Sequence, residues 1–153
     1  MRTGGPAVRP TGRQLLVLVG VGLLPWTVIT WPGGTQVVAL WGLLNPATLH
    51  VVSLPEYLFV LTAGLPDRLL AWPASALLYL AGLGAVVADR YGRGDRRLTV
   101  GLLGLAGLAH LGFAAGVAAR GAAAVLPIGP VLLGAALWWF DGPFIRRWVA
   151  GER

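Results

Sequence analysis

The stretch LTVGLLGLAGLAHLGFAAGVAA, residues 98–119, indicates the class of this protein, because it holds 22 residues without a charge between Arg97 and Arg120. A helix needs about 20 apolar residues to cross a bilayer, since about 30 Å of hydrocarbon is spanned at about 1.5 Å per residue. Residues 69–88 and 121–140 are two further uncharged stretches of 20 residues, each bounded by charged residues. The sequence therefore predicts three transmembrane helices.

The composition agrees with a membrane protein. Of the 153 residues, 56% are hydrophobic and 12% are charged, whereas a soluble domain carries about 25% charged residues. All twelve basic residues are arginines, and they cluster beside apolar segments, as expected of a chain that contacts anionic lipid headgroups at the cytoplasmic face rather than nucleic acid. The absence of cysteine excludes disulfides, a thiolate nucleophile and a Cys-ligated metal.

The N-terminal part is harder to assign. Residues 15–31 predict a first transmembrane helix, slightly short and interrupted by Pro25. The competing interpretation is a signal peptide, but no small-x-small cleavage site follows the apolar run, so we expect an uncleaved helix.

Residues 32–68 predict an extracytoplasmic cap that is broken by prolines. Within it, residues 36–44 and 48–54 are rich in Val, Leu and Thr on either side of an Asn45-Pro46 turn, which favours extended segments and a crude hairpin. Residues 56–65 predict a short helix that starts after Pro55.

Arginine positions predict the orientation. Ten of the twelve arginines lie in segments that a four-helix chain places on one side, and Arg68 and Arg120 lie on the other. The positive-inside rule then puts both termini and the loop 89–97 in the cytoplasm. We therefore predict an all-α fold in the cell membrane: one domain over residues 1–153, a polytopic four-helix transmembrane bundle with N-in and C-in topology. The predicted helices are 15–31, 69–88, 98–119 and 121–140, followed by a cytoplasmic tail over 141–153 that includes a short surface helix.

Four residues are candidates for a polar layer inside the bundle. Counted from the cytoplasmic helix ends at about 1.5 Å per residue, Thr27 and His110 lie about 18 Å deep, and Ser75 and Pro127 lie about 20 Å deep. A buried imidazole needs partners, so we expect His110 to bond Thr27, Ser75 or the carbonyl of Ala123 that Pro127 would free. Two interpretations stay open: a structural hydrogen bond, and a protonatable site or solute contact.

The predicted helix over 98–119 is rich in glycine. Missing side chains let backbones approach closely in lipid, so these glycines predict helix packing, either within the chain or across a homodimer seam. The candidate packing residues are Gly101, Gly104, Gly107, Gly112 and Gly116.

The loop ADRYGRGDRR, residues 88–97, resembles the cytoplasmic loop between helices 2 and 3 of major facilitator transporters, with the pattern G-x-x-x-D-R-x-G-R-R. Asp89, Arg90, Gly92 and Arg93 match, whereas Gly84 is one position away and a glycine replaces an arginine at position 94. The resemblance covers about ten residues and implies a charge latch that controls helix movement. The alternative is a tight glycine turn whose arginines set the topology. The charged candidates are Asp89, Arg90, Arg93, Asp95, Arg96 and Arg97.

No enzyme site is recognisable. His50 and His110 have no paired-ligand spacing, and the six acidic residues fall at predicted helix ends or in loops. We expect no catalytic residues, no metal and no cofactor.

A second resemblance covers more of the chain. WPGG at 31–34, WGLLNP at 41–46 and LPEYLFVLTAGLPDRLLAWPASALLY at 54–79 resemble a group of small haloarchaeal membrane proteins without an assigned activity. The resemblance implies topology and habitat but no mechanism. From the sequence we expect a non-enzymatic accessory or scaffolding component that acts through protein or lipid contacts, in a homo-oligomer or a larger membrane complex. The alternative is an oligomeric small-solute transporter or channel component.

Overall fold

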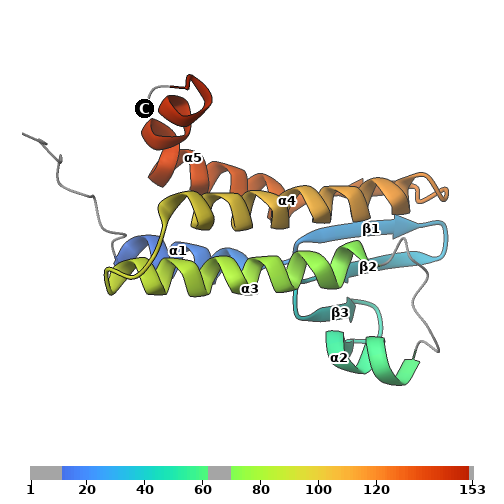
Figure 1. The fold of residues 1–153 in the computed structure, drawn as a ribbon. Coiled ribbons are helices and arrows are strands. Elements are labelled where there is room, and N and C mark those ends of the chain that lie inside the picture. The colour runs from blue at the N-terminus through green and yellow to red at the C-terminus, as the bar shows by residue number, and fades with distance from the viewer. Residues whose placement is uncertain (1–11, 62–69, 152–153) are drawn as a thin grey trace, which may run out of the picture.

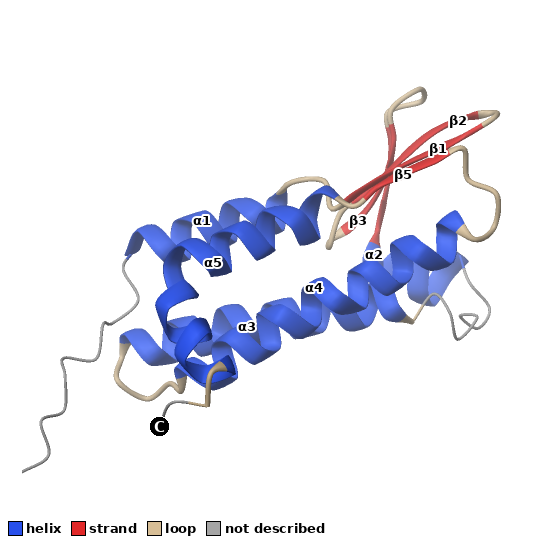
Figure 2. Ribbon diagram, turned by 90° about the horizontal axis from the view of Figure 1, so that it is seen from above, coloured by secondary structure: helices blue, strands red, loops and turns tan. Residues whose placement is uncertain are grey.

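The computed structural model describes residues 12–61 and 70–151. The helices in this part are α1 (Gly12–Leu23), α2 (Leu54–Glu56), the π-helical turn η1 (Tyr57–Leu61), α3 (Ala71–Arg90), α4 (Arg96–Ala118) and α5 (Ile128–Val149). The strands are β1 (Thr27–Trp31), β2 (Gly34–Val38), β3 (Gly42–Asn45), β4 (His50–Ser53) and β5 (Ala124–Leu126). The long helices lie side by side, and the sheet projects from one end of them (Figures 1 and 2).

Three of the described helices, α3, α4 and α5, are long and apolar enough to cross a membrane. The bounds of α3 and α4 agree with the predictions over 69–88 and 98–119 to within about two residues at each end.

The predicted helix over 15–31 is wrong in its second half. α1 has 12 residues and ends at Leu23, so it reaches about 18 Å, short of a full span. Pro25 has no N–H and disfavours helical geometry at Leu24. The following residues, TVITW, are β-branched or aromatic and form β1. The four-helix transmembrane bundle is therefore not confirmed, and the prediction of an all-α fold is wrong, because the described residues also form a five-stranded sheet.

Within the described residues the strands form one antiparallel sheet, with the order β4-β3-β2-β1-β5. β1 and β2 make a hairpin that closes at the pair Trp31–Gly34. β3 and β4 make a second hairpin that closes at the pair Asn45–His50, so the predicted Asn45-Pro46 turn is correct. The predicted segment 36–44 is interrupted at residues 39–41 and contributes to both β2 and β3.

The helix predicted over 121–140 starts too early. Residues 124–126 form β5, which extends the sheet by pairing Ile29 with Val125. Gly121 turns the chain back with a φ of 85°, and Pro127 occupies the N-cap position of α5. Pairing with the otherwise open edge of β1 outweighs the helical tendency of this alanine-rich segment.

The boundary predicted at residue 141 is also wrong. α5 continues through Asp141, Gly142 and Pro143 to Val149, so the predicted surface helix of the tail is the end of α5. Pro143 lies inside the helix, and its missing N–H accounts for a bend. Figures 1 and 2 show the last turns of α5 directed away from its first part.

Two apolar clusters form the core. One joins the helices and contains Leu18 of α1, Trp26, Leu103 of α4 and Leu133 of α5. The other joins the sheet to the helices and contains Ile29, Val38, Trp72, Phe113 and Val117. The start of α1, the α3–α4 turn and the end of α5 lie at one end of the molecule, opposite the sheet (Figure 1).

Candidate functional site

A hydrogen-bonded centre lies where the helices meet the sheet. His110 of α4 is fully buried. Its Nε2 lies 2.9 Å from Oγ1 of Thr27, the first residue of β1, and its Nδ1 lies 3.1 Å from Oγ of Ser75 on α3. Thr27 and Ser75 are also fully buried. One imidazole therefore ties three elements that are far apart in the sequence.

The direction of each hydrogen bond follows from Ser75. Its hydroxyl donates to the backbone carbonyl of Trp72 at 2.7 Å. A serine hydroxyl has one proton, so towards His110 its oxygen can only accept, and the proton of the ring must be on Nδ1. Nε2 is then the acceptor for the hydroxyl of Thr27. The chain Thr27 → His110 → Ser75 → Trp72 uses both ring nitrogens of a neutral histidine.

Aromatic rings enclose this centre. The ring of Trp26 lies edge-on to that of His110 at a centroid distance of 5.0 Å, and Phe113 lies at 5.4 Å. The indole N–H of Trp26 donates to the carbonyl of Val21 at 2.9 Å, so it does not compete for the imidazole. The surroundings of His110 are thus apolar except for the two hydroxyls.

The fourth residue of the predicted layer has another role. Pro127 forms the N-cap of α5, and Pro130 is in the first turn of that helix. Amides in a first turn have no helical acceptor, so neither proline frees a carbonyl for His110, and that part of the prediction is wrong. Instead, the amide of Gly129 donates to the carbonyl of Trp26 at 3.0 Å.

A second polar cluster lies at the arginine-rich end, and the sequence analysis missed it. Asp141 is 2% exposed; its Oδ1 lies 2.7 Å from Nε of Arg96, and its Oδ2 accepts from Gln14 at 3.1 Å. Arg96 also donates to the carbonyl of Phe140 at 3.1 Å. These bonds tie α1, α4 and α5 together. The sequence places Gln14, Arg96 and Asp141 at the same end of three helices, and this shared position could have indicated the cluster. It was missed because the sequence analysis assigned Asp141 to the cytoplasmic tail.

The loop 88–97 is a tight glycine turn in the structure. Gly92 has a φ of 73°, and its amide donates to the carbonyl of Asp89 at 2.9 Å. A side chain at Gly94 would lie 2.4 Å from the backbone of Asp89, which explains a glycine where the transporter pattern has an arginine. Asp95 caps α4 by accepting from the amide of Arg97 at 2.8 Å. The side chains of Arg90, Arg93 and Arg97 are exposed there.

The predicted packing glycines divide into two groups. A Cβ at Gly107 would lie 3.6 Å from Leu133 of α5, so this glycine faces a helix of the same chain. For the other four, Gly101, Gly104, Gly112 and Gly116, a Cβ would meet nothing within 4 Å. Closer approaches inside the chain occur at Gly22, Gly82 and Gly129, where a Cβ would collide with Tyr79, Leu103 and Trp26, respectively.

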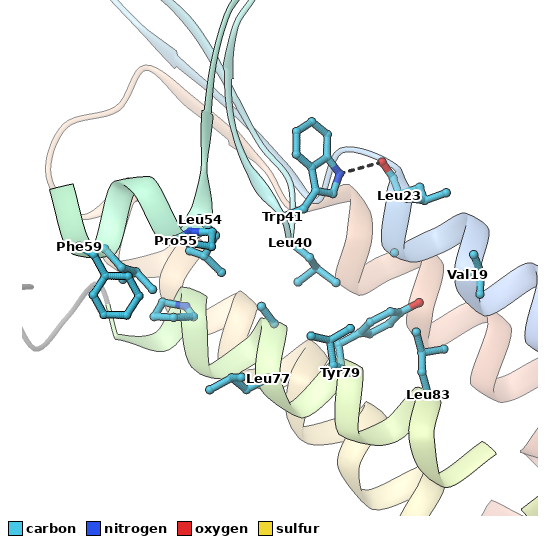
Figure 3. A pocket seen from close by; sticks show the side chains of 15 residues that line it. Val19, Leu23, Leu40, Trp41, Leu54, Pro55, Phe59, Leu77, Tyr79 and Leu83 are labelled. Carbon is cyan, nitrogen blue, oxygen red and sulfur yellow. Dashed lines mark hydrogen bonds between the residues drawn. The ribbon is translucent and has the colours of Figure 1, made fainter. Parts of the chain in front are cut away.

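A lateral groove of about 610 Å³ lies between α1 and α3 (Figure 3). Val19 and Leu23 line it from α1, Leu77 and Leu83 from α3, and Phe59 of η1 lies at one end. The sequence analysis did not predict this groove, because its walls come from four separate segments.

The described residues contain three helices able to cross a membrane by length and composition, which is consistent with a membrane protein. A family model described as a domain of unknown function, DUF8050, matches residues 3–151, and the chain therefore belongs to this family. The match agrees with the predicted resemblance to an uncharacterised family. No curated protein and no solved structure matches the chain.

Proposed function

We propose that this DUF8050 protein is a non-enzymatic integral membrane protein, an accessory or scaffolding component that acts through contacts of its outer surface with lipid and protein. The observation that carries the proposal is the closed interior. Among the described residues, no buried side-chain nitrogen or oxygen lacks a hydrogen-bond partner. Both nitrogens of His110 are engaged by Thr27 and Ser75, which leaves the ring no free position for a substrate.

The outer surface of the helices supports the same proposal. Large apolar side chains stand exposed on every long helix, as a lipid environment requires. They include Leu77 and Leu80 of α3, Leu105 and Leu108 of α4, and Val131 and Trp139 of α5. The buried polar groups of the described residues are hydrogen-bonded within the chain, and the exposed apolar side chains remain available to contact lipid and protein.

We assign the arginine-rich end to the cytoplasm, with both termini on that side, and the sheet to the opposite side. Open sheet edges do not occur against hydrocarbon, and β4 and β5 are the edges of this sheet, which supports a position at the interface or beyond it. Trp26 and Thr27, which follow soon after the short α1, are fully buried, so this part of the non-helical chain is covered by protein. The Lys-free composition further supports a haloarchaeal source.

The alternative, an oligomeric small-solute transporter or channel component, needs a polar route through the chain or between copies of it. The His110 centre supplies no such route within one chain, because its own hydroxyl partners and the rings of Trp26 and Phe113 fill it.

Replacement of the imidazole tests the proposal. His110→Asn keeps a donor close to the Ser75 oxygen but removes the titratable ring. The variant is expressed in a strain from which the gene has been deleted, and growth and membrane composition are compared with those of the wild type. We expect the variant to restore whichever of these the deletion changes, in proportion to the amount of folded protein in the membrane. A folded, membrane-inserted variant that fails to restore the phenotype would contradict a purely structural histidine and thereby the proposed function.

A further inference from the structure

We propose that the groove between α1 and α3 binds one hydrocarbon chain of a membrane lipid from the leaflet next to the sheet. This inference rests on the proposed function as a membrane protein and names one of its contacts. The occupant is argued from the chemistry, the size and the position of the groove.

The lining of the groove offers a ligand no hydrogen bonds. The hydroxyl of Tyr79 donates to the carbonyl of Leu18, and the indole N–H of Trp41 donates to the carbonyl of Leu23 at 3.3 Å (Figure 3). Gly22 permits the first of these bonds, because a Cβ there would lie 2.7 Å from the tyrosine ring. With these two polar groups committed to α1, the remaining surface is aliphatic and aromatic, and it matches a hydrocarbon.

The length of the groove suits an extended hydrocarbon chain. Along α3 the lining runs from Pro73 to Leu83, a rise of ten steps or about 15 Å. The groove holds about 610 Å³ over that length, with one wall from α1 and the other from α3, so an extended chain can lie along it. A helix of a second copy is the competing occupant, and the crosslinking experiment below separates the two.

The position of the groove matches one leaflet. Its length of about 15 Å is half of the hydrocarbon thickness of about 30 Å. It occupies the half of α3 that adjoins the sheet, and Phe59 of η1 lies at its end farthest from the arginines. Leu77, which lines the groove, is 69% exposed, so the groove opens sideways towards lipid.

Photocrosslinking tests this inference on the full chain. The purified protein is reconstituted in phosphatidylglycerol vesicles in which one chain of each tracer lipid carries a diazirine, and adducts are mapped by mass spectrometry. We expect adducts concentrated on residues 19–23 and 73–83. Leu77→Trp fills the groove from α3 and should reduce those adducts to the level found elsewhere on the surface. Leu105→Trp, on an exposed side chain of α4 outside the groove, is the matched control and should leave them unchanged.

Val19→Trp blocks the groove from the opposite wall and provides the same readout if Leu77→Trp does not fold. Adducts spread evenly over all exposed apolar residues, an unchanged pattern in a folded groove variant, or adducts that join two copies of the chain through the groove would each overturn the inference. None of these results would overturn the proposed function, which the His110→Asn variant tests separately.

Discussion

His110 donates to Ser75 and cannot accept from it, because the single hydroxyl proton of Ser75 is already bound to a backbone carbonyl on its own helix. The imidazole is therefore held as one neutral tautomer between α3 and the first residue of β1. His110 therefore connects α3 and α4 to the sheet through two hydrogen bonds whose donors and acceptors are fixed.

The tautomer of His110 can be measured directly. We expect ¹⁵N NMR of histidine-labelled protein in detergent to show a neutral ring with the proton on Nδ1. The exposed His50 serves as an internal reference, because an imidazole in contact with water should exchange between both tautomers. A proton on Nε2 of His110 at neutral pH would contradict the hydrogen-bond chain derived from Ser75.

Gly129 should be sensitive to the smallest substitution. A Cβ at this position would lie 2.3 Å from Cγ of the fully buried Trp26, so Gly129→Ala should lower the free energy of unfolding by about 1–3 kcal/mol. Gly134→Ala on the same helix is the control, because a Cβ there meets nothing within 4 Å. That control should be neutral or stabilising by up to about 1 kcal/mol. Thermal unfolding in detergent compares the two, and equal midpoints would disprove the packing at Trp26.

Asp141 should contribute to stability as the acceptor for Arg96 and Gln14. Asp141→Asn removes the charge that balances Arg96, and we expect a loss of about 1–3 kcal/mol, less than for a fully buried pair because the arginine side chain is 30% exposed. Glu56→Gln, at an exposed acid, should leave stability unchanged. The measurement is denaturant unfolding of both variants, and matching curves would show that the buried pair is dispensable.

Hydropathy was sufficient to predict α3 and α4, because their length, their apolar composition and their flanking charges all indicate the same structure. It failed at residues 27–31 and 124–126, where apolar β-branched or alanine-rich segments resemble part of a span. There the pairing of β1 with β2 and β5 decides the structure. The β1–β2 hairpin is local, but its first strand continues an apolar run that also suits a helix. The β1–β5 pairing joins segments far apart in the sequence and leaves no local signal.

Part of the candidate site could also be predicted from the sequence. Counting residues from the helix ends placed Thr27, Ser75 and His110 at a similar depth. In the structure His110 is hydrogen-bonded to both of the others, although Thr27 lies on a strand. The role given to Pro127 assumed a helix on both sides of it, and no such helix exists. The groove could not be predicted, since it depends on how η1 folds over α1 and α3.

Single-cysteine labelling tests the central claim, that the chain spans the membrane with its arginine-rich end in the cytoplasm and its sheet outside. The sequence has no cysteine, so Tyr91→Cys in the α3–α4 turn and Gly33→Cys in the β1–β2 turn carry the only thiols. Both positions are exposed, and a Cβ at Gly33 meets nothing within 4 Å. In intact cells, an impermeant maleimide should label Gly33→Cys at once and Tyr91→Cys only after permeabilisation. Labelling of Tyr91→Cys in intact cells, or protection of Gly33→Cys, would contradict the account.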